Sequence, residues 1–309
     1  MTAVYLLLGD PQDPYCLGIQ SILERRNHPT RIIPNPLAHP WRFTWNLNSA
    51  KSASQLAEDG GSPLPDEHIA GVLVRNSGWI NPEGWQADDL AYMQTETRAA
   101  LLAWLWSLAC PVVNRYPPVI WYQPRLPLLS WQRLLRRCGL PTSETLVTNV
   151  EQEARLFGGR LAREGVAGLV YGPLTSETHY LVSGDVDLNG LVTLQRYAPV
   201  CLTYPHGPVQ TVCVVGELVV WEGEPPHESA RLESALRSFA AVVGLDFVEL
   251  AFAPAPEGFC VVDVEPYPHF EHFGEAARQR MMNGLVDLLT ASVGASPKGG
   301  AYSLVESHS

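Results

Sequence analysis

Short apolar runs separated by helical segments are the feature that most constrains the fold of this chain. Residues 3–8 read Ala-Val-Tyr-Leu-Leu-Leu, a continuous apolar run that is typical of a strand covered on both faces. A turn at Gly9 and Asp10 follows, and residues 15–26 are predicted to form a helix. Strands covered on both faces occur mostly in parallel sheets flanked by helices, so the chain is expected to begin with such a sheet.

The same pattern continues to about residue 115. Strands are expected at residues 31–34, 69–75 and 111–114, and a long helix is expected at 88–108. Residues 46–66 are rich in Asn, Ser, Gly and Pro and are predicted to form a loop. The resulting order, β-α-β-β-α-β, predicts a largely parallel sheet.

The rest of the chain is dominated by strands. A helix at 130–138 and an extended segment at 141–147 precede Asn149, which is expected to cap a helix that ends at 163. A hairpin is predicted around Gly216. The remaining strands are expected at 168–171, 180–182, 191–197, 209–215, 217–221, 246–252 and 258–264, and the remaining helices at 229–243 and 274–289.

These elements predict an α/β (α+β) fold divided into three subdomains. The first is an N-terminal α/β unit at 1–115, and the second is a central unit at 116–200. The third spans 201–293, and a frayed Gly- and Ser-rich tail is expected at 294–309.

Charge and composition exclude several classes of function. The net charge of −11 argues against a nucleic-acid partner, because proteins that bind phosphate backbones need a positive surface. The longest apolar windows are too short to cross a membrane. The six cysteines are scattered, which favours reduced, buried thiols over disulfides or a zinc site. The start of the chain lacks the pattern of a signal peptide, so we expect a cytoplasmic protein.

Several short segments, in this order, resemble the ATP-grasp ligases. They begin with the helix that contains Glu96 and Leu101, continue through Asn114, and reach the extended segment Leu-Pro-Thr-Ser-Glu-Thr at 140–145. The resemblance is greatest to the group that includes ribosomal glutamate ligases, glutathione synthetases and microviridin-type peptide macrocyclases. The strand that ends at Val74-Arg75, followed by the helix with Glu96, is reminiscent of the macrocyclases in particular.

The C-terminal part continues this resemblance. Residues 244–250, Gly-Leu-Asp-Phe-Val-Glu-Leu, resemble the strand of the family that carries an acidic metal ligand. Residues 261–268, Val-Val-Asp-Val-Glu-Pro-Tyr-Pro, resemble its Glu-x-Asn-x-x-Pro strand. The matches cover about residues 75–275, and they imply an ATP-grasp fold, ATP and Mg²⁺ as cofactors, and formation of a bond between a carboxylate and an amine or hydroxyl.

Three acidic residues are the candidate metal ligands. Asp263 and Glu265 lie two positions apart on a predicted strand and therefore share one face, and Glu249 on a neighbouring strand is expected to join them. Carboxylates suit a hard cation such as Mg²⁺. His269 and His272 follow directly and are additional candidates for a metal or a substrate, although packing and hydrogen bonding are the commoner roles of such histidines.

The phosphate side of the expected site departs from the family. Lys51 and Lys298 are the only lysines in the chain, and neither aligns with the two lysines that the family uses on the nucleotide. Gly172 occupies one of those positions, and the other falls near residues 118–125. The candidate phosphate ligands are therefore arginines, namely Arg125, Arg196 and Arg75. Arginine binds phosphate through a planar fork, so it does not simply replace a lysine.

Three further departures concern the nucleotide. The loop at 174–178, which is glycine-rich in the family, reads Leu-Thr-Ser-Glu-Thr. The strand at 200–204 has no acid for the ribose, and Gln210 stands where the resemblance implies an arginine.

Tryptophans at 41, 45, 79, 85, 121 and 131 lie beside loops and Pro-rich segments. As a group they are compatible either with a peptide-binding surface or with hydrophobic cover over loops.

The sequence therefore leaves three hypotheses open. In the first, which we favour, a degenerate ATP-grasp protein binds a peptide or protein partner in a peptide or natural-product modification context, with no cofactor of its own. In the second, an active ATP- and Mg²⁺-dependent carboxylate–amine or ester-forming ligase holds phosphate with arginines. In the third, a different metal-dependent activity uses Asp263, Glu265, His269 and His272. The oligomeric state stays open, and a homodimer is one option.

Overall fold

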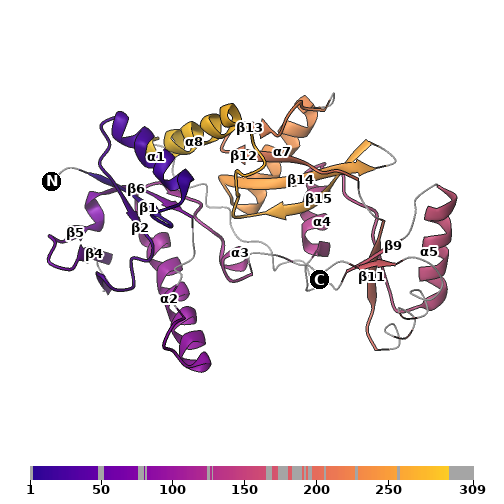
Figure 1. Cartoon of the computed structure of the whole chain (residues 1–309), viewed down its shortest axis with the longest axis horizontal. Helices are drawn as coiled ribbons and strands as arrows, with labels where there is room; N and C mark the ends of the chain where they lie inside the picture. Colours follow the sequence, from indigo (N-terminus) through magenta and orange to yellow (C-terminus); the bar gives the residue numbers. More distant parts are fainter. Residues whose placement is uncertain are drawn as a thin grey trace, which may run out of the picture.

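The computed structural model describes residues 3–47, 52–75, 80, 82–123, 126, 128–164, 169–172, 180–182, 190, 193, 197–204, 207–226, 229–255 and 258–291. Within these ranges the chain forms four sheets with helices packed on them (Figure 1). The mixed α/β architecture confirms the predicted fold class.

The N-terminal unit is built on a parallel sheet, as predicted. Its strands follow the order β2-β1-β6-β7. Their bounds are β1 (Val4–Leu8), β2 (Thr30–Ile33), β6 (Ile69–Val74) and β7 (Val112–Val113). The helices of this unit are α1 (Pro14–Arg25) and α2 (Ala87–Ser107).

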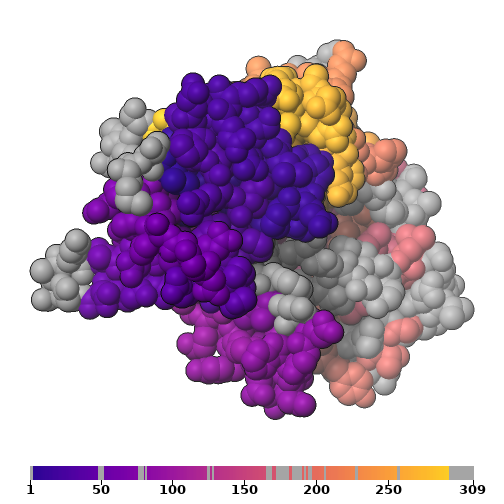
Figure 2. All heavy atoms as spheres, turned by 60° about the vertical axis from the view of Figure 1, so that its left-hand side comes forward, coloured from indigo at the N-terminus to yellow at the C-terminus, as the bar shows by residue number. Residues whose placement is uncertain are grey.

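Helices cover both faces of this parallel sheet, which explains its continuous apolar runs. Helix α1 lies beside α8 (Glu275–Thr290) on one face, where Leu7 and Leu73 are buried against them (Figure 1 and Figure 2). The C-terminal half of α2 covers the other face, where Leu6 and Val72 are buried. Helix α8, from the C-terminal part of the chain, thus completes the core of the first unit.

The predicted loop at 46–66 is wrong over most of its length. The chain forms a second, antiparallel sheet from β3 (Trp41–Leu47), β4 (Ser52–Glu58) and β5 (Leu64–Pro65), followed by the 3-10 turn η1 (Asp66–His68). Ser54 is buried and accepts a hydrogen bond of 2.9 Å from the indole of Trp104. The Asn-, Ser- and Gly-rich composition concealed strands whose outer faces meet solvent.

The central unit is a smaller antiparallel sheet of order β10-β9-β11-β8, covered by one helix. Its elements are β8 (Leu146–Thr148), α5 (Glu151–Arg163), β9 (Leu169–Gly172), β10 (Tyr180–Val182) and β11 (Val200–Thr203). Two details differ from prediction. Val150, not Asn149, is the N-cap residue of α5, and no side chain caps it. In the predicted strand at 191–197, Thr193 is helical and Tyr197 lies in a turn, and the other residues fall outside the described ranges.

The C-terminal unit is an antiparallel sheet of order β13-β12-β14-β15. Its elements are β12 (Gln210–Val215), β13 (Leu218–Trp221), α7 (Ser229–Val243), β14 (Phe247–Ala255) and β15 (Gly258–Glu265). The predicted hairpin between β12 and β13 is confirmed, and Gly216 has the positive φ of 57° that its turn requires.

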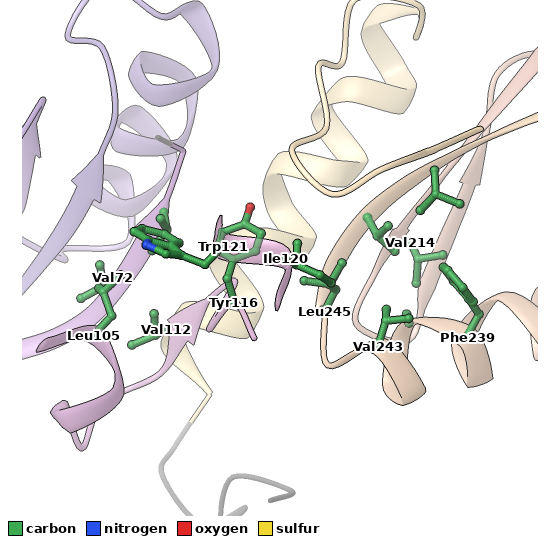
Figure 3. Packing of buried hydrophobic residues seen from close by; sticks show 14 of the residues in the cluster. Val72, Leu105, Val112, Tyr116, Ile120, Trp121, Val214, Phe239, Val243 and Leu245 are labelled. Atoms are coloured by element: carbon green, nitrogen blue, oxygen red, sulfur yellow. The ribbon is translucent and has the colours of Figure 1, made fainter. Parts of the chain in front are cut away.

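Two short helices link the units. Helix α3 (Pro118–Tyr122) brings Trp121 and Ile120 under the N-terminal sheet. Helix α4 (Leu128–Arg137) packs on α7, with the rings of Trp131 and Phe239 5.8 Å apart. Figure 3 shows the resulting core, which runs from Val72 through Ile120 and Leu245 to Phe239 without a break between the first and last units. The predicted boundaries at 115, 200 and 293 stay predictions. Strand β11 runs across the one at 200.

Asn114 fixes the junction between the first and last units. Its side chain is fully buried, and its carboxamide donates a 2.6 Å hydrogen bond to the carbonyl of Phe247. The same carboxamide accepts a 2.7 Å bond from the backbone N–H of Phe247. Close by, the hydroxyl of Tyr116 donates to the carbonyl of Pro266 at 3.1 Å. Two backbone groups at the start of β14 thus depend on one side chain for their hydrogen bonds.

In the part of the chain that the structure describes, no helix is both long and apolar enough to cross a membrane.

Replacing Asn114 by alanine is expected to lower the free energy of unfolding by about 2 to 4 kcal/mol, because two buried backbone groups of Phe247 lose their partner. Urea denaturation measures this change. Asn149→Ala is the matched control: Asn149 is exposed and caps nothing, so its loss is expected to leave stability within about 0.5 kcal/mol. Equal effects of the two substitutions would contradict this role for Asn114.

Candidate functional site

The pairing of β14 with β15 brings two of the predicted acidic residues face to face. Glu249 lies directly opposite Glu265 in the register, while Asp263 lies opposite Ala251. Alternation along β15 places Asp263 and Glu265 on one face, as predicted. The side chains differ in depth, since Glu249 is 8% exposed, Glu265 is half-buried and Asp263 is exposed. The exposure of the three acids therefore increases from Glu249 through Glu265 to Asp263.

Glu249 is the most perturbed of these acids. Burial raises the pKa of its carboxyl, and the neighbouring carboxylate of Glu265 raises it further. The backbone N–H of His269, which donates to Glu249 at 3.3 Å, and the imidazoles of His269 and His272 act in the opposite direction. The predicted histidines thus lie close enough to Glu249 to influence its charge.

The other two acids are turned partly toward their own backbone. Glu265 accepts a 2.8 Å bond from the N–H of Tyr267, and Asp263 accepts a 2.9 Å bond from the N–H of Val264. Among the described residues, no group of three or more His, Cys, Asp or Glu side chains has the arrangement of a metal site. Two facing carboxylates still suit Mg²⁺, which is usually held by one or two carboxylates together with phosphate oxygens. The complete three-residue site stays a prediction.

Arg75, a predicted phosphate ligand, is engaged in contacts between subdomains. It follows β6, and its guanidinium donates a 2.6 Å hydrogen bond to the carbonyl of Pro268. It also lies 3.5 Å from the carboxylate of Asp13, and only 11% of its side chain is exposed. The rings of Tyr15 and Phe270 lie 6.0 and 5.4 Å from it. Arg75 therefore ties the end of the first sheet to the segment that follows β15.

Phe270 shapes this segment. Its ring is 1% exposed and stacks on Tyr15 at 4.3 Å, while its backbone has a φ of 35°, in the left-handed region that bulky residues rarely adopt. Such a backbone persists only where the surroundings hold it. Here the buried ring fixes the direction of the chain between His269 and His272.

The phosphate side of the predicted site lies largely outside the described residues. Arg125, Arg196, Lys51, Lys298 and the loop at 174–178 all fall there. Gly172 ends β9 opposite Cys201 and offers no charge.

Two parts of the expected nucleotide site lie within the described residues, namely Gln210 and strand β11. The carboxamide of Gln210 donates 2.7 Å bonds to the carbonyls of Glu222 and Glu224, so it is committed to the hairpin that β12 forms with β13. Strand β11 is buried along its whole length and carries no acid. Gln210 and strand β11 therefore offer a nucleotide no charged side chain within the described residues.

Sequence reasoning missed several residues that shape this site, namely Asp13, Tyr15, Asn114, Tyr116 and Phe270. Asn114 contacts a residue 133 positions away, and Arg75 contacts one 193 positions away. Nothing in local periodicity signals such contacts. The one available clue was the lack of any acid near Arg75 in the sequence, which implied a distant partner.

No family model and no curated protein sequence matches the chain. Solved structures do. The macrocyclase MdnC from Microcystis aeruginosa MRC, bound with precursor peptide MdnA, superposes with a TM-score of 0.73 at 15% identity, covering 94% of this chain and 100% of that one. A RiPP-associated ATP-grasp ligase from Chryseobacterium gregarium, in complex with ADP and a leader and core peptide, gives 0.70 at 16% identity, covering 94% and 96%. The ATP-grasp ligase PsnB, complexed with minimal precursor, Mg and ADP, gives 0.67 at 19% identity, covering 93% and 98%.

The chain has the ATP-grasp fold. The likeness spans nearly its whole length, so the predicted resemblance to ATP-grasp ligases is confirmed at the level of the fold. At these identities a shared fold does not transfer an activity, which has to be argued from the site.

Replacing Glu249 by glutamine is expected to stabilise the protein at neutral pH when no divalent cation is present. The folded state raises the pKa of this carboxyl, so its charged form is less favourable folded than unfolded. Wild-type stability should fall as pH rises from the unfolded pKa of about 4.5 through the raised folded value, and the glutamine variant should lack this component.

Thermal unfolding between pH 4 and 8 in a chelator measures the difference between the two proteins. The control substitution is Glu153→Gln at an exposed acid on α5; because it keeps Glu249, it should retain the pH dependence of the wild type. A glutamine variant at position 249 that is less stable than wild type at pH 7.5 would contradict the assignment.

Proposed function

We propose that this chain binds a peptide in a peptide-modification context and does not use ATP in the conventional way. The state of Arg75 carries this proposal. It is the one candidate phosphate ligand within the described residues, and its guanidinium is already engaged by the carbonyl of Pro268 and the carboxylate of Asp13, beside the stacked rings of Tyr15 and Phe270. Recruiting it to a nucleotide would take from the half-buried Asp13 carboxylate its cation and leave it only its bonds within the first turn of α1, which is costly.

The lysine content supports the same conclusion. ATP-grasp chemistry needs positive charge where the phosphates lie, because the protein contributes mainly positioning and charge neutralisation. With two lysines in 309 residues, both outside the expected positions, the lysine charges that the family places there are missing from the sequence. Gln210, which stands where the resemblance implies an arginine and is engaged in the hairpin, extends the loss to one further position.

The peptide partner is supported by the structural comparisons. MdnC is described as bound with a precursor peptide, and the Chryseobacterium ligase as bound with a leader and core peptide. This chain shares their fold over 94% of its length. A surface that binds a peptide can therefore be kept in this fold even where the nucleotide site is lost.

A second function is favoured by one specific observation, the facing pair Glu249 and Glu265. Two facing carboxylates, one of them buried, repel each other. A bound divalent cation would offset this repulsion, and that gives the pair a physical reason. In this alternative the chain is an active ligase that holds Mg²⁺ on Glu249, Glu265 and Asp263. ATP would supply a phosphate to activate a carboxylate, and an amine or hydroxyl of the peptide would then displace it.

Thermal unfolding with millimolar ATP and Mg²⁺ separates these two functions. The proposed function predicts no change in stability, whereas a site filled at one hundred times its dissociation constant would stabilise the fold by about 2.7 kcal/mol. Glu265→Gln and the control Glu217→Gln, whose side chain is 94% exposed, test whether any shift passes through the acidic pair.

A Mg²⁺-dependent shift that Glu265→Gln abolishes and Glu217→Gln keeps would establish the alternative. Mass spectrometry provides the second readout, because each amide or ester bond that the protein forms removes one water from the peptide. Such a product, formed only with ATP, would overturn the proposed function.

A further inference from the structure

A hollow of about 430 Å³ lies on the N-terminal unit, away from the acidic pair. It is lined by Leu37 and Ala38 after β2, by Ile80 and Trp85 between β6 and α2, and by Tyr92, Met93, Glu96 and Thr97 on α2. Its volume falls in the range of small-ligand sites. The hollow is also placed where open α/β sheets bind ligands, beyond the carboxyl ends of parallel strands, here β2 and β6.

Helix α2 lines the hollow with the same side that, farther along the helix, packs into the core. Met93, Thr97, Leu101 and Leu105 follow one another at intervals of four, which keeps them on one side of a helix. Leu101 and Leu105 are buried against the sheet, but the N-terminal half of the helix extends beyond it (Figure 1). Met93 and Thr97 therefore face the hollow instead of a core.

Two large aromatic side chains at the hollow are exposed. Trp85 is 53% exposed and Tyr92 is 68% exposed. Trp104 and Trp121 are fully buried, while Trp106 farther along α2 is 42% exposed. Of the two interpretations that the sequence left open for its tryptophans, hydrophobic cover holds for Trp121, and a binding surface fits Trp85 better.

Among the described residues that line the hollow, Glu96 is the only charged one. Its neighbours at intervals of three and four along α2 are Tyr92, Met93, Ala99 and Ala100, so the helix gives it no cation. Arg98, which is close in sequence, donates instead to the carbonyl of Trp121 on the other side of the helix. Within the described structure Glu96 has no ion-pair partner. Aromatic faces beside a carboxylate are a recognised environment for a guanidinium or an ammonium group.

We propose that this hollow binds a basic side chain of the peptide partner, with its cation held between Glu96 and the rings of Trp85 and Tyr92. The aliphatic stem of an arginine or lysine would lie along Leu37 and Met93. The negative charge of the whole chain, −11, favours the approach of a basic segment. The inference rests on the proposed function, since it names where the peptide is held and by which chemistry.

Fluorescence anisotropy with two labelled five-residue peptides tests the proposal. In one, a central arginine is flanked by leucine and phenylalanine; in the other, citrulline replaces the arginine and removes only its charge. The wild-type protein should bind the arginine peptide more tightly. Glu96→Gln should raise the dissociation constant of the arginine peptide by about fivefold, as expected for a partly exposed ion pair. The dissociation constant of the citrulline peptide should not change. Glu153→Gln, a change of an exposed acid on α5, should affect neither.

The aromatic contribution is tested separately. Trp85→Ala should weaken the binding of both peptides by about fivefold or more, because the proposed site places the ring against the apolar stem of the arginine or citrulline as well as against the cation. The side chains of Trp85 and Glu96 are both exposed, so each can be replaced with little risk to folding. Binding of the arginine peptide should also weaken as salt is raised.

Equal binding of the two peptides by wild type, or no effect of Glu96→Gln, would overturn the inference. So would a dimer that Trp85→Ala converts to a monomer, since a second copy would then cover the hollow. These outcomes leave the proposed function standing, because that function fails on a different readout, the ATP-dependent loss of water from a peptide.

Discussion

The carboxamide of Asn114 and the guanidinium of Arg75 hold the two large units of this protein together. Each side chain follows a strand of the first sheet. Asn114 satisfies backbone groups of Phe247 in the last sheet, and Arg75 satisfies the carbonyl of Pro268 in the segment after it. Buried polar groups are costly to leave unpaired, so these contacts specify one arrangement of the units in a way that apolar packing alone does not. The acidic pair, the histidine segment and the buried ring of Phe270 all lie along this junction. Its geometry therefore sets what the candidate site can bind.

The contacts of Arg75 at this junction give it a structural role. Positive charge that the sequence keeps near β6 serves structure, held by Asp13 and by two aromatic rings. Across the junction, burial raises the pKa of the Glu249 carboxyl, and the facing Glu265 raises it further.

Elements with strong local signals could be predicted from the sequence. Helix α7 occupies the expected residues Ser229–Val243, and the turn at Gly216 lies where the hairpin requires a positive φ. Strand β4 was missed because its residues, Ser-Ala-Ser-Gln-Leu-Ala-Glu, are mostly small or polar. Strand β3, Trp-Arg-Phe-Thr-Trp-Asn-Leu, alternates apolar and polar residues and could have been predicted. In the site, the pairing of Glu249 with Glu265 followed from strand order. The partners of Asn114 and Arg75 did not, because those contacts join segments more than one hundred residues apart.

The central claim is that the Arg75 guanidinium belongs to the junction and not to a phosphate site. NMR of protein labelled with ¹⁵N at arginine measures it directly, with the Arg75 side-chain signal assigned through an Arg75→Lys variant. The account predicts that the guanidinium protons of Arg75 exchange with water much more slowly than those of Arg42, whose side chain is 63% exposed, and that millimolar ATP with Mg²⁺ leaves the Arg75 signal unmoved. Exchange as fast as that of Arg42, or a shift of the Arg75 signal on adding the nucleotide, would contradict it.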